Sequence, residues 1–224
     1  DVFLDRIRER TGIEVRCITG EEEAELTARG VLFALGEPSE NTVVFDMGGG
    51  STEFIAVSGS GAPTVRSTPI GAVLLTERFL AADPPNQAAL EKLSRYVDAL
   101  LHTALPQWNN QGGRRTLVAT GGTATSLAAM VHHIPVARIA PERMNGLRIG
   151  LPELRTLYER ISTMPISKRL ALTGLDQGRA EVIHSGAAAV IRIMTYFVSP
   201  ALRVCLSDLL EGILIQAIEG DRDG

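Results

Sequence analysis

Three apolar runs in this chain each end in a loop of small and polar residues, and this pattern constrains the fold more than any other feature. The runs span residues 42–46, 116–120 and 202–206. Their length and their β-branched residues predict strands, and the helix-like segments between them predict crossover connections. Such connections place the three strands parallel in one sheet. The loops after them therefore meet at the carboxyl edge, where open α/β sheets bind ligands.

The remaining segments complete a mixed sheet. Two more strands are predicted over 52–57 and 64–68, with turns near 47–51 and 59–61, and a short separate strand is expected over 13–18. Capping and periodicity predict helices over 4–10, 20–35, 72–81, 86–105, 123–133, 178–197 and 209–218, with one more beginning near Pro152. The order indicates the α/β class, with a mixed five-stranded sheet, helices on both faces and a largely helical insertion over about 138–200.

The first loop has the composition of a phosphate site. It reads Asp46-Met47-Gly48-Gly49-Gly50-Ser51-Thr52-Glu53. Consecutive glycines let the backbone approach a ligand, and successive N–H groups in such a turn form a concavity that binds anions. The flanking Asp46 and Glu53 would repel a phosphate unless they hold water or a hydrated cation, and Mg²⁺ binds in this way. This favours a functional loop over a glycine-rich hairpin with solvated acids.

The second loop is a strand-to-helix turn, Thr120-Gly121-Gly122-Thr123. It presents N–H groups at a helix N-terminus, which is a favourable place for an anion. Taken alone, the two glycines are equally well explained by close packing. Beside the first loop, the anion-binding interpretation becomes the stronger one.

Three consecutive glutamates, Glu21, Glu22 and Glu23, open the helix that begins near residue 20. Thr19 stands three residues before Glu22, which is the pattern of a capping box, and acids in a first turn complement the helix dipole. Hydrolysis also needs a base that orients or deprotonates water, and a carboxylate can serve. The spacing does not select one of the three for that role.

Other polar residues allow two interpretations each. Arg179 with Glu181 forms either a substrate-binding pair or a pair at a helix start. Asp208 and Glu211 follow the last strand, so they either face the predicted crevice or cap the last helix. Ser51 has no histidine nearby in sequence that would activate it, which argues against a serine hydrolase.

Composition limits the partners. The net charge of −4 argues against a basic surface for polyanions, so an anion must be held by local geometry. Aromatic residues make up only 4%, which disfavours stacking on nucleic-acid bases. Cys17 and Cys205 lie outside any paired motif, as expected in a reducing, cytoplasmic compartment. We find no membrane-spanning stretch or signal peptide and expect no membrane partner.

Several of these segments resemble, in order, the exopolyphosphatase/guanosine pentaphosphate phosphohydrolase family, part of the actin-like, sugar-kinase-like phosphotransfer superfamily. They are TGIEVRCITGEEEAELTARGV, VVFDMGGGSTEFIAV, STPIGAVLLTERF, VATGGTATSLAAM, GRAEVIHSGAAAVIRIM and LSDLLEGIL, and they run from about residue 4 to residue 219. DMGGGSTE with the upstream GEEEA is the specific part. The resemblance implies a ribonuclease-H-like lobe and Mg²⁺-dependent hydrolysis of terminal phosphoryl groups from polyphosphate, or from pppGpp to give ppGpp.

The resemblance also implies roles for individual residues. Glu23, immediately before Ala in the EEA element, is similar to the catalytic base, and Asp46 and Glu53 resemble the acids that position metal and water. The phosphate-binding residues would be Gly48, Gly49, Gly50 and Ser51 in the first loop and Gly121, Gly122 and Thr123 in the second. The implied partners are polyphosphate or guanosine penta- and tetraphosphate, with a homodimer as a further expectation.

Two departures from the family pattern matter. The lobe with an Asp-x-Gly-Ser-Asn-type loop does not occur here, and the chain begins without Met inside a predicted helix. We therefore interpret residues 1–224 as the C-terminal lobe of a two-lobed phosphatase and expect it to be poorly active alone. In addition, Leu210 precedes Glu211-Gly212 where the family usually has Arg.

Two alternatives to a hydrolase follow from the same loops. An alarmone- or nucleotide-binding regulatory module would use them to hold phosphates with little turnover. An ATP-using kinase of the same superfamily would use the Gly121 loop for adenosine phosphates.

Overall fold

A computed structural model describes residues 2–36, 41–57, 63–106, 108 and 115–220. Its centre is a six-stranded sheet in the order β3-β2-β1-β4-β6-β5. The strands are β1 (Thr42–Met47), β2 (Thr52–Val57), β3 (Thr64–Thr68), β4 (Thr116–Thr120), β5 (Arg148–Gly150) and β6 (Ala201–Val204). The turn expected at 59–61 lies outside the described residues.

The three parallel strands predicted from the sequence are confirmed. β1 pairs in parallel with β4, and β4 pairs in parallel with β6, while the β1–β2, β2–β3 and β5–β6 pairs are antiparallel. Asp46 lies opposite Thr120 across the β1–β4 pair. The loops after β1, β4 and β6 therefore share the carboxyl edge of the sheet.

Two strand predictions need correction. The sheet has six strands rather than five, because β5 is only three residues long and too short to show an alternating pattern. The strand expected over 13–18 does not form, and that segment is extended chain with no ladder partner among the described residues. Ile13 is 60% exposed, so no apolar burial favours pairing there.

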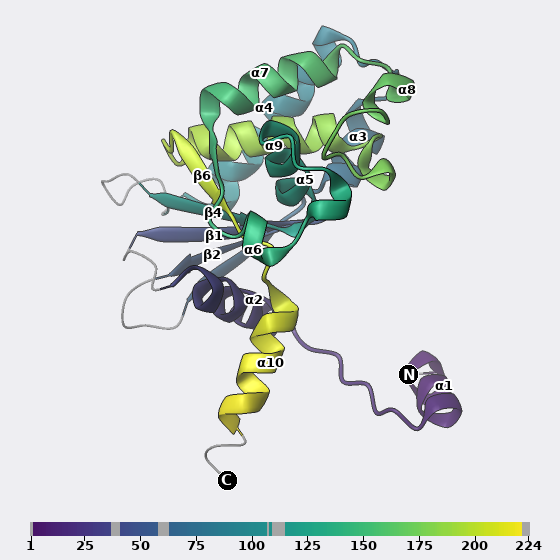
Figure 1. Cartoon of the computed structure of the whole chain (residues 1–224), viewed down its shortest axis with the longest axis vertical. Helices are drawn as coiled ribbons and strands as arrows, with labels where there is room; N and C mark the ends of the chain where they lie inside the picture. The colour runs from purple at the N-terminus through teal and green to yellow at the C-terminus, as the bar shows by residue number, and fades with distance from the viewer. Residues whose placement is uncertain (1, 37–40, 58–62, 107, 109–114, 221–224) are drawn as a thin grey trace.

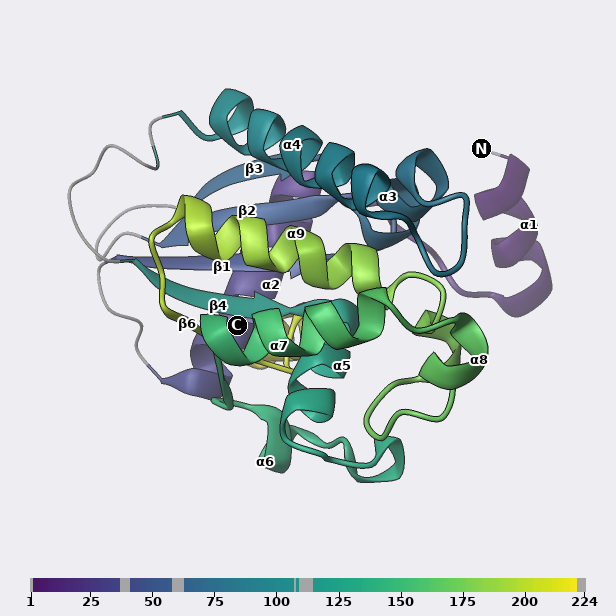
Figure 2. The same ribbon diagram turned by 90° about the horizontal axis from the view of Figure 1, so that it is seen from above.

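Helices cover both faces of the sheet, as predicted (Figures 1 and 2). α2 lies on one face, with α10 packed against α2 and running away from the sheet. α4, α9 and α7 lie side by side over the other face, with α3 and α5 near the carboxyl edge. The helices are α1 (Val2–Thr11), α2 (Gly20–Leu35), α3 (Ala72–Phe79), α4 (Gln87–Ala104), α5 (Gly121–Val131), α6 (Pro141–Met144), α7 (Leu151–Ser162), α8 (Ile166–Arg169), α9 (Ile183–Tyr196) and α10 (Leu209–Gly220), with 3₁₀ turns η1 (Val136–Arg138) and η2 (Gln177–Arg179).

The helix predicted to begin at 178 begins at Ile183 instead. The side chain of Asp176 accepts the N–H of Gly178 and starts the separate 3₁₀ turn η2. A side chain that bonds to the backbone two residues on competes with a regular helix. As a result Arg179 lies in a turn ahead of α9 and not on its first face.

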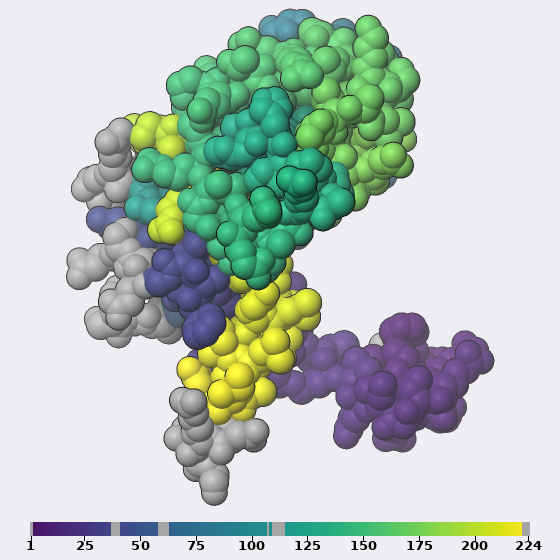
Figure 3. Space-filling model, viewed as in Figure 1, coloured from purple at the N-terminus to yellow at the C-terminus, as the bar shows by residue number. Residues whose placement is uncertain are grey.

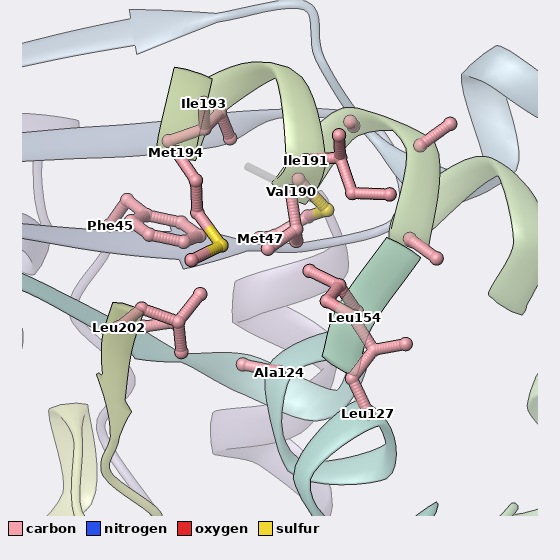
Figure 4. Close-up of a cluster of buried hydrophobic side chains, with 14 of the residues drawn as sticks. Phe45, Met47, Ala124, Leu127, Leu154, Val190, Ile191, Ile193, Met194 and Leu202 are labelled. Carbon is pink, nitrogen blue, oxygen red and sulfur yellow. The ribbon is translucent and has the colours of Figure 1, made fainter. Parts of the chain in front are cut away.

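Strand residues alternate between two hydrophobic clusters. Phe45 and Met47 point into the larger cluster under α9, where they meet Met194 and Leu202 (Figure 4). Val44 points the other way, into the smaller cluster beneath α2. This period of two decides which face each residue of β1 serves at the carboxyl edge.

α10 crosses α2 at unusually short range. A Cβ atom at Gly30 would lie 2.0 Å from the carbonyl oxygen of Asp208, and one at Gly212 would lie 1.9 Å from that of Leu26. The two helix backbones therefore touch through two glycines. In contrast, α1 stands away from the sheet layers at the end of an extended segment (Figures 1 and 3), and all its residues are exposed or half-buried.

Candidate functional site

Asp46 is the centre of a group of carboxylates at the carboxyl edge. It lies opposite Glu53 on β2 and opposite Thr120 on β4. Burial is the main reason that the pKa of Asp46 rises to about 6. Negative charges that add to this effect come from Asp208, Glu53 and Glu23. Three acids, from α2, from β2 and from the segment between β6 and α10, therefore act on Asp46 here, and such a cluster is typical of functional sites.

The three glutamates at the start of α2 have different surroundings. Glu22 completes the predicted capping box: the Thr19 hydroxyl accepts its N–H at 3.1 Å, and its carboxylate accepts the Thr19 N–H at 2.9 Å. It also pairs with Arg16 at 3.2 Å. The Glu22 carboxylate is therefore engaged in the helix cap. The charge of exposed Glu23 acts on Asp46.

The other two acids of the group are held by hydrogen bonds. The Ser67 hydroxyl donates to Glu53 at 2.8 Å. Asp208 accepts the N–H of Leu210 at 3.4 Å, and Glu211 accepts the N–H of Asp208 at 2.9 Å. Both interpretations of Asp208 therefore hold, because it caps α10 and belongs to the carboxylate group. Its position after the last strand was the sequence signal for that second role.

Backbone hydrogen bonds from α3 hold the glycine-rich turn after β1 in place. The Gly48 N–H donates to the Ser51 carbonyl at 3.0 Å and closes the turn. The carbonyls of Gly48 and Gly49 accept N–H groups from the first turn of α3, at 2.9–3.1 Å. Since its carbonyls are engaged by the helix, the turn has a defined shape, and its three glycines are exposed.

A pocket of about 350 Å³ opens between this turn, the start of α5 and η2. Its polar and small lining residues are Gly48, Gly49, Gly122, Thr123, Asp176, Gly178 and Arg179. Gly50, Ser51 and Gly121 lie outside the lining, although all three belong to the same two loops. A larger groove of about 970 Å³ lies between α4, α7 and α9 and is lined by other residues.

Arg179 supplies positive charge to the pocket. Its guanidinium lies directly over Gly122, where an added Cβ would meet Nη2 at 2.0 Å. The ion pair of Arg179 is with Asp176 at 3.5 Å, and both side chains are partly exposed. Glu181, the expected partner, is exposed on the following turn. Sequence reasoning left the role of Arg179 open because η2 was not foreseen.

The carboxylate group and the pocket meet at one contact. Asp46 comes two residues after Val44 on β1, so both point to the same face of the sheet, toward α2. Met47 points to the opposite face, toward α9, and lines the pocket. Gly121 lies between them, with its α-carbon against the Asp46 carboxylate. The predicted acids and the predicted phosphate loops are thus adjacent, one set on each side of the end of β1.

The donor set suits a hydrated divalent cation. Within the described residues, no three His, Cys, Asp or Glu side chains form a ready metal cage. Asp46 and Glu53 are nevertheless neighbours on paired strands, and mutual repulsion contributes to the raised pKa of Asp46. A cation with one or two carboxylates and several waters, as Mg²⁺ prefers, would relieve that repulsion.

No helix in the described part of the chain is long and apolar enough to cross a membrane.

Comparisons with known proteins identify the family. The family model described as the Ppx/GppA phosphatase family matches residues 1–220. Exopolyphosphatase 1 of Mycobacterium leprae is 30% identical over 224 residues, which is 100% of this chain and 65% of that protein. Exopolyphosphatase 2 of Mycobacterium tuberculosis is 34% identical over 208 residues, 91% of this chain and 64% of that protein. The chain therefore spans slightly less than two thirds of these relatives.

Crystal structures show the same fold. The Aquifex aeolicus member of the Ppx/GppA family superimposes with a TM-score of 0.86 at 27% identity, over 98% of this chain and 69% of that one. An exopolyphosphatase from Cytophaga hutchinsonii gives 0.84 at 30% identity, over 98% and 70%.

Proposed function

The chain belongs to the Ppx/GppA phosphatase family, and on this premise we propose that it carries the phosphate-binding and water-activating wall of an enzyme that releases terminal phosphate from inorganic polyphosphate. The observation that supports this most is the contact between Asp46 and Gly121, because it joins a carboxylate group to an anion pocket. Relatives named exopolyphosphatase point to the same substrate class.

Each part of the site has a role in this proposal. Glu23 accepts a proton from a water molecule whose oxygen attacks the terminal phosphorus. The bond from that phosphorus to the bridging oxygen breaks, so the products are phosphate and a chain shorter by one unit. Asp46 and Glu53 would hold hydrated Mg²⁺, and the bound cation would neutralise charge on the phosphates.

The pocket positions the substrate. Loop N–H groups at Gly48 and Gly49, the N-terminus of α5 and the Arg179 guanidinium would donate to phosphate oxygens. Phosphoryl transfer depends mainly on such positioning and on electrostatic stabilisation. We propose Mg²⁺ as the cation and the cytoplasm as the location of the protein.

The test compares binding and turnover in the intact protein. Medium-chain polyphosphate, pppGpp and ATP are supplied with Mg²⁺, and phosphate release and affinity are measured together. We expect polyphosphate to be hydrolysed fastest. Glu23→Gln should lower release by at least about 10²-fold, the scale of a lost general base, with affinity nearly unchanged. Glu21→Gln, at an exposed glutamate two residues away, is the matched control.

Other results would support the alternatives. Tight binding of pppGpp without release of phosphate would favour a regulatory module. Transfer of phosphate from ATP to an acceptor would favour a kinase. Equal turnover in Glu23→Gln and the control would remove Glu23 from the role of base.

A further inference from the structure

Arg169, at the end of α8, is almost completely buried, with 2% of its side chain exposed. A buried guanidinium is costly unless its N–H groups are paired. Here Nε donates to the Ala180 carbonyl at 2.7 Å, Nη1 to the Met164 carbonyl at 2.5 Å and Nη2 to Asp83 Oδ1 at 2.7 Å. One side chain therefore connects three separate segments.

Asp83 extends this connection. Its second oxygen accepts the Ile166 N–H, the first of α8, at 2.6 Å. The Asp83 carboxylate thus holds both ends of α8, one through the backbone and one through Arg169. The segment between α8 and α9 is anchored to the loop after α3 in this way.

The end of this chain of contacts is the phosphate pocket. Ala180 directly follows Arg179, whose guanidinium lies over Gly122. The turn η2 is closed by local bonds only: the Arg179 N–H donates to the Asp176 carbonyl at 2.9 Å, the Ala180 N–H to the Gln177 carbonyl at 3.2 Å, and the Gly178 N–H to the Asp176 side chain at 3.0 Å. A single 3₁₀ turn of this kind is weakly stable by itself. The Ala180 carbonyl is therefore the point at which the buried arginine fixes it.

We propose that Arg169 is a positioning residue that holds Arg179 over the phosphate pocket through the Ala180 carbonyl, with Asp83 as its anchor. The effect on ligand binding rests on the proposed function, whereas the effect on the turn does not. Lys at position 169 would keep the charge but would not reproduce the planar set of donors that reaches three segments.

Two measurements on the intact chain test this. Amide hydrogen exchange follows residues 176–182, and calorimetry follows the binding of inorganic tripolyphosphate with Mg²⁺. Arg169→Lys and the milder Asp83→Asn should each raise exchange in 176–182 by at least about tenfold, with β1 and β4 unchanged. Each should weaken tripolyphosphate binding about tenfold, the scale of one lost contact to a charged group.

Two controls separate positioning from general instability. Arg192→Lys alters another arginine–aspartate pair, Arg192 to Asp98 at 2.6 Å, which links α9 to α4 away from the pocket. It should change neither readout. Combining Arg169→Lys with Arg179→Gln should weaken binding no more than Arg179→Gln alone, because Arg169 acts through Arg179.

Several results would overturn the inference. Unchanged exchange in 176–182, an equal rise throughout the sheet, or additive losses in the double variant would each do so. Absence of tripolyphosphate binding by the unmodified chain would instead count against the proposed function, and the exchange data would still decide whether Arg169 holds the turn.

Discussion

The carboxylate of Asp46 packs against the α-carbon of Gly121, so that a Cβ atom at position 121 would lie 2.4 Å from Oδ1. Gly121 also has a φ of +85°, a conformation that residues with a side chain rarely adopt. Glycine is therefore required at the start of α5 for two reasons: the backbone conformation at position 121 and the close contact with Asp46. Four expected outcomes follow from this region and from the interior behind it.

Gly121→Ala should destabilise the chain by at least about 2 kcal/mol, because it strains the backbone and displaces Asp46. The free energy of unfolding in urea measures this. Gly20→Ala is the control, since a Cβ atom there meets nothing within 4 Å. Equal stability of the two variants would mean that the end of β1 adapts to a side chain.

Gly122→Ala should leave stability nearly unchanged and weaken tripolyphosphate binding about tenfold. The new Cβ meets the guanidinium of Arg179, which is a flexible group that can move away. Neighbouring glycines should thus separate into one needed for folding and one needed for binding. Calorimetry beside a thermal melt measures both. Unaltered affinity would show that Arg179 is not needed where it lies.

Asp46→Asn and Glu53→Gln should each raise the Mg²⁺ concentration at half-maximal phosphate release by several fold, because each removes a hard, charged oxygen ligand. A Mg²⁺ titration of the intact protein at fixed polyphosphate concentration measures the midpoint. Glu181→Gln, at an exposed acid two residues after η2, serves for comparison. Midpoints equal to that of the comparison variant would leave both acids with a structural role.

His184 should make the fold sensitive to mild acid. It is 2% exposed, and among the described residues its Nδ1 has no hydrogen-bond partner. Burial, and then the positive charge of Arg169, lower its pKa from 6.5 to about 4. The unfolded chain therefore binds this proton more readily, so stability present above pH 6.5 is lost as the pH falls toward 4. The loss is at most about 3 kcal/mol.

The comparison of His184→Gln with the unmodified chain between pH 4 and pH 7.5 tests this. The unmodified chain should lose stability more steeply on acidification, since glutamine does not take up a proton. Parallel curves would indicate that the imidazole is charged, or well hydrated, in the folded chain.

Local signals in the sequence were sufficient for most of the fold. The capping box of Thr19 and Glu22 placed the start of α2 correctly, because both of its bonds lie within four residues. The parallel strands followed from the crossover rule, which depends on element order alone. β5 and the extended segment 13–18 were misjudged because short strands are decided by their neighbours in the sheet.

The site depended more on contacts between distant segments. Residue spacing does not show whether Glu22 or Glu23 is the better candidate for the base. The structure distinguishes them, because Glu22 forms both hydrogen bonds of the helix cap. The place of Arg179 depends on η2 and on Arg169, which approaches from another segment. No pattern within one stretch of sequence contains such information.

The close crossing of α2 and α10 also limits how this sequence can diverge. Gly30 faces the backbone at Asp208, and Gly212 faces the backbone at Leu26, so neither glycine faces a side chain that could become smaller. A substitution at either position therefore has no compensating substitution across the contact. Homologues that carry a larger residue at one of these sites should differ in the angle or separation of the two helices rather than in the residue opposite.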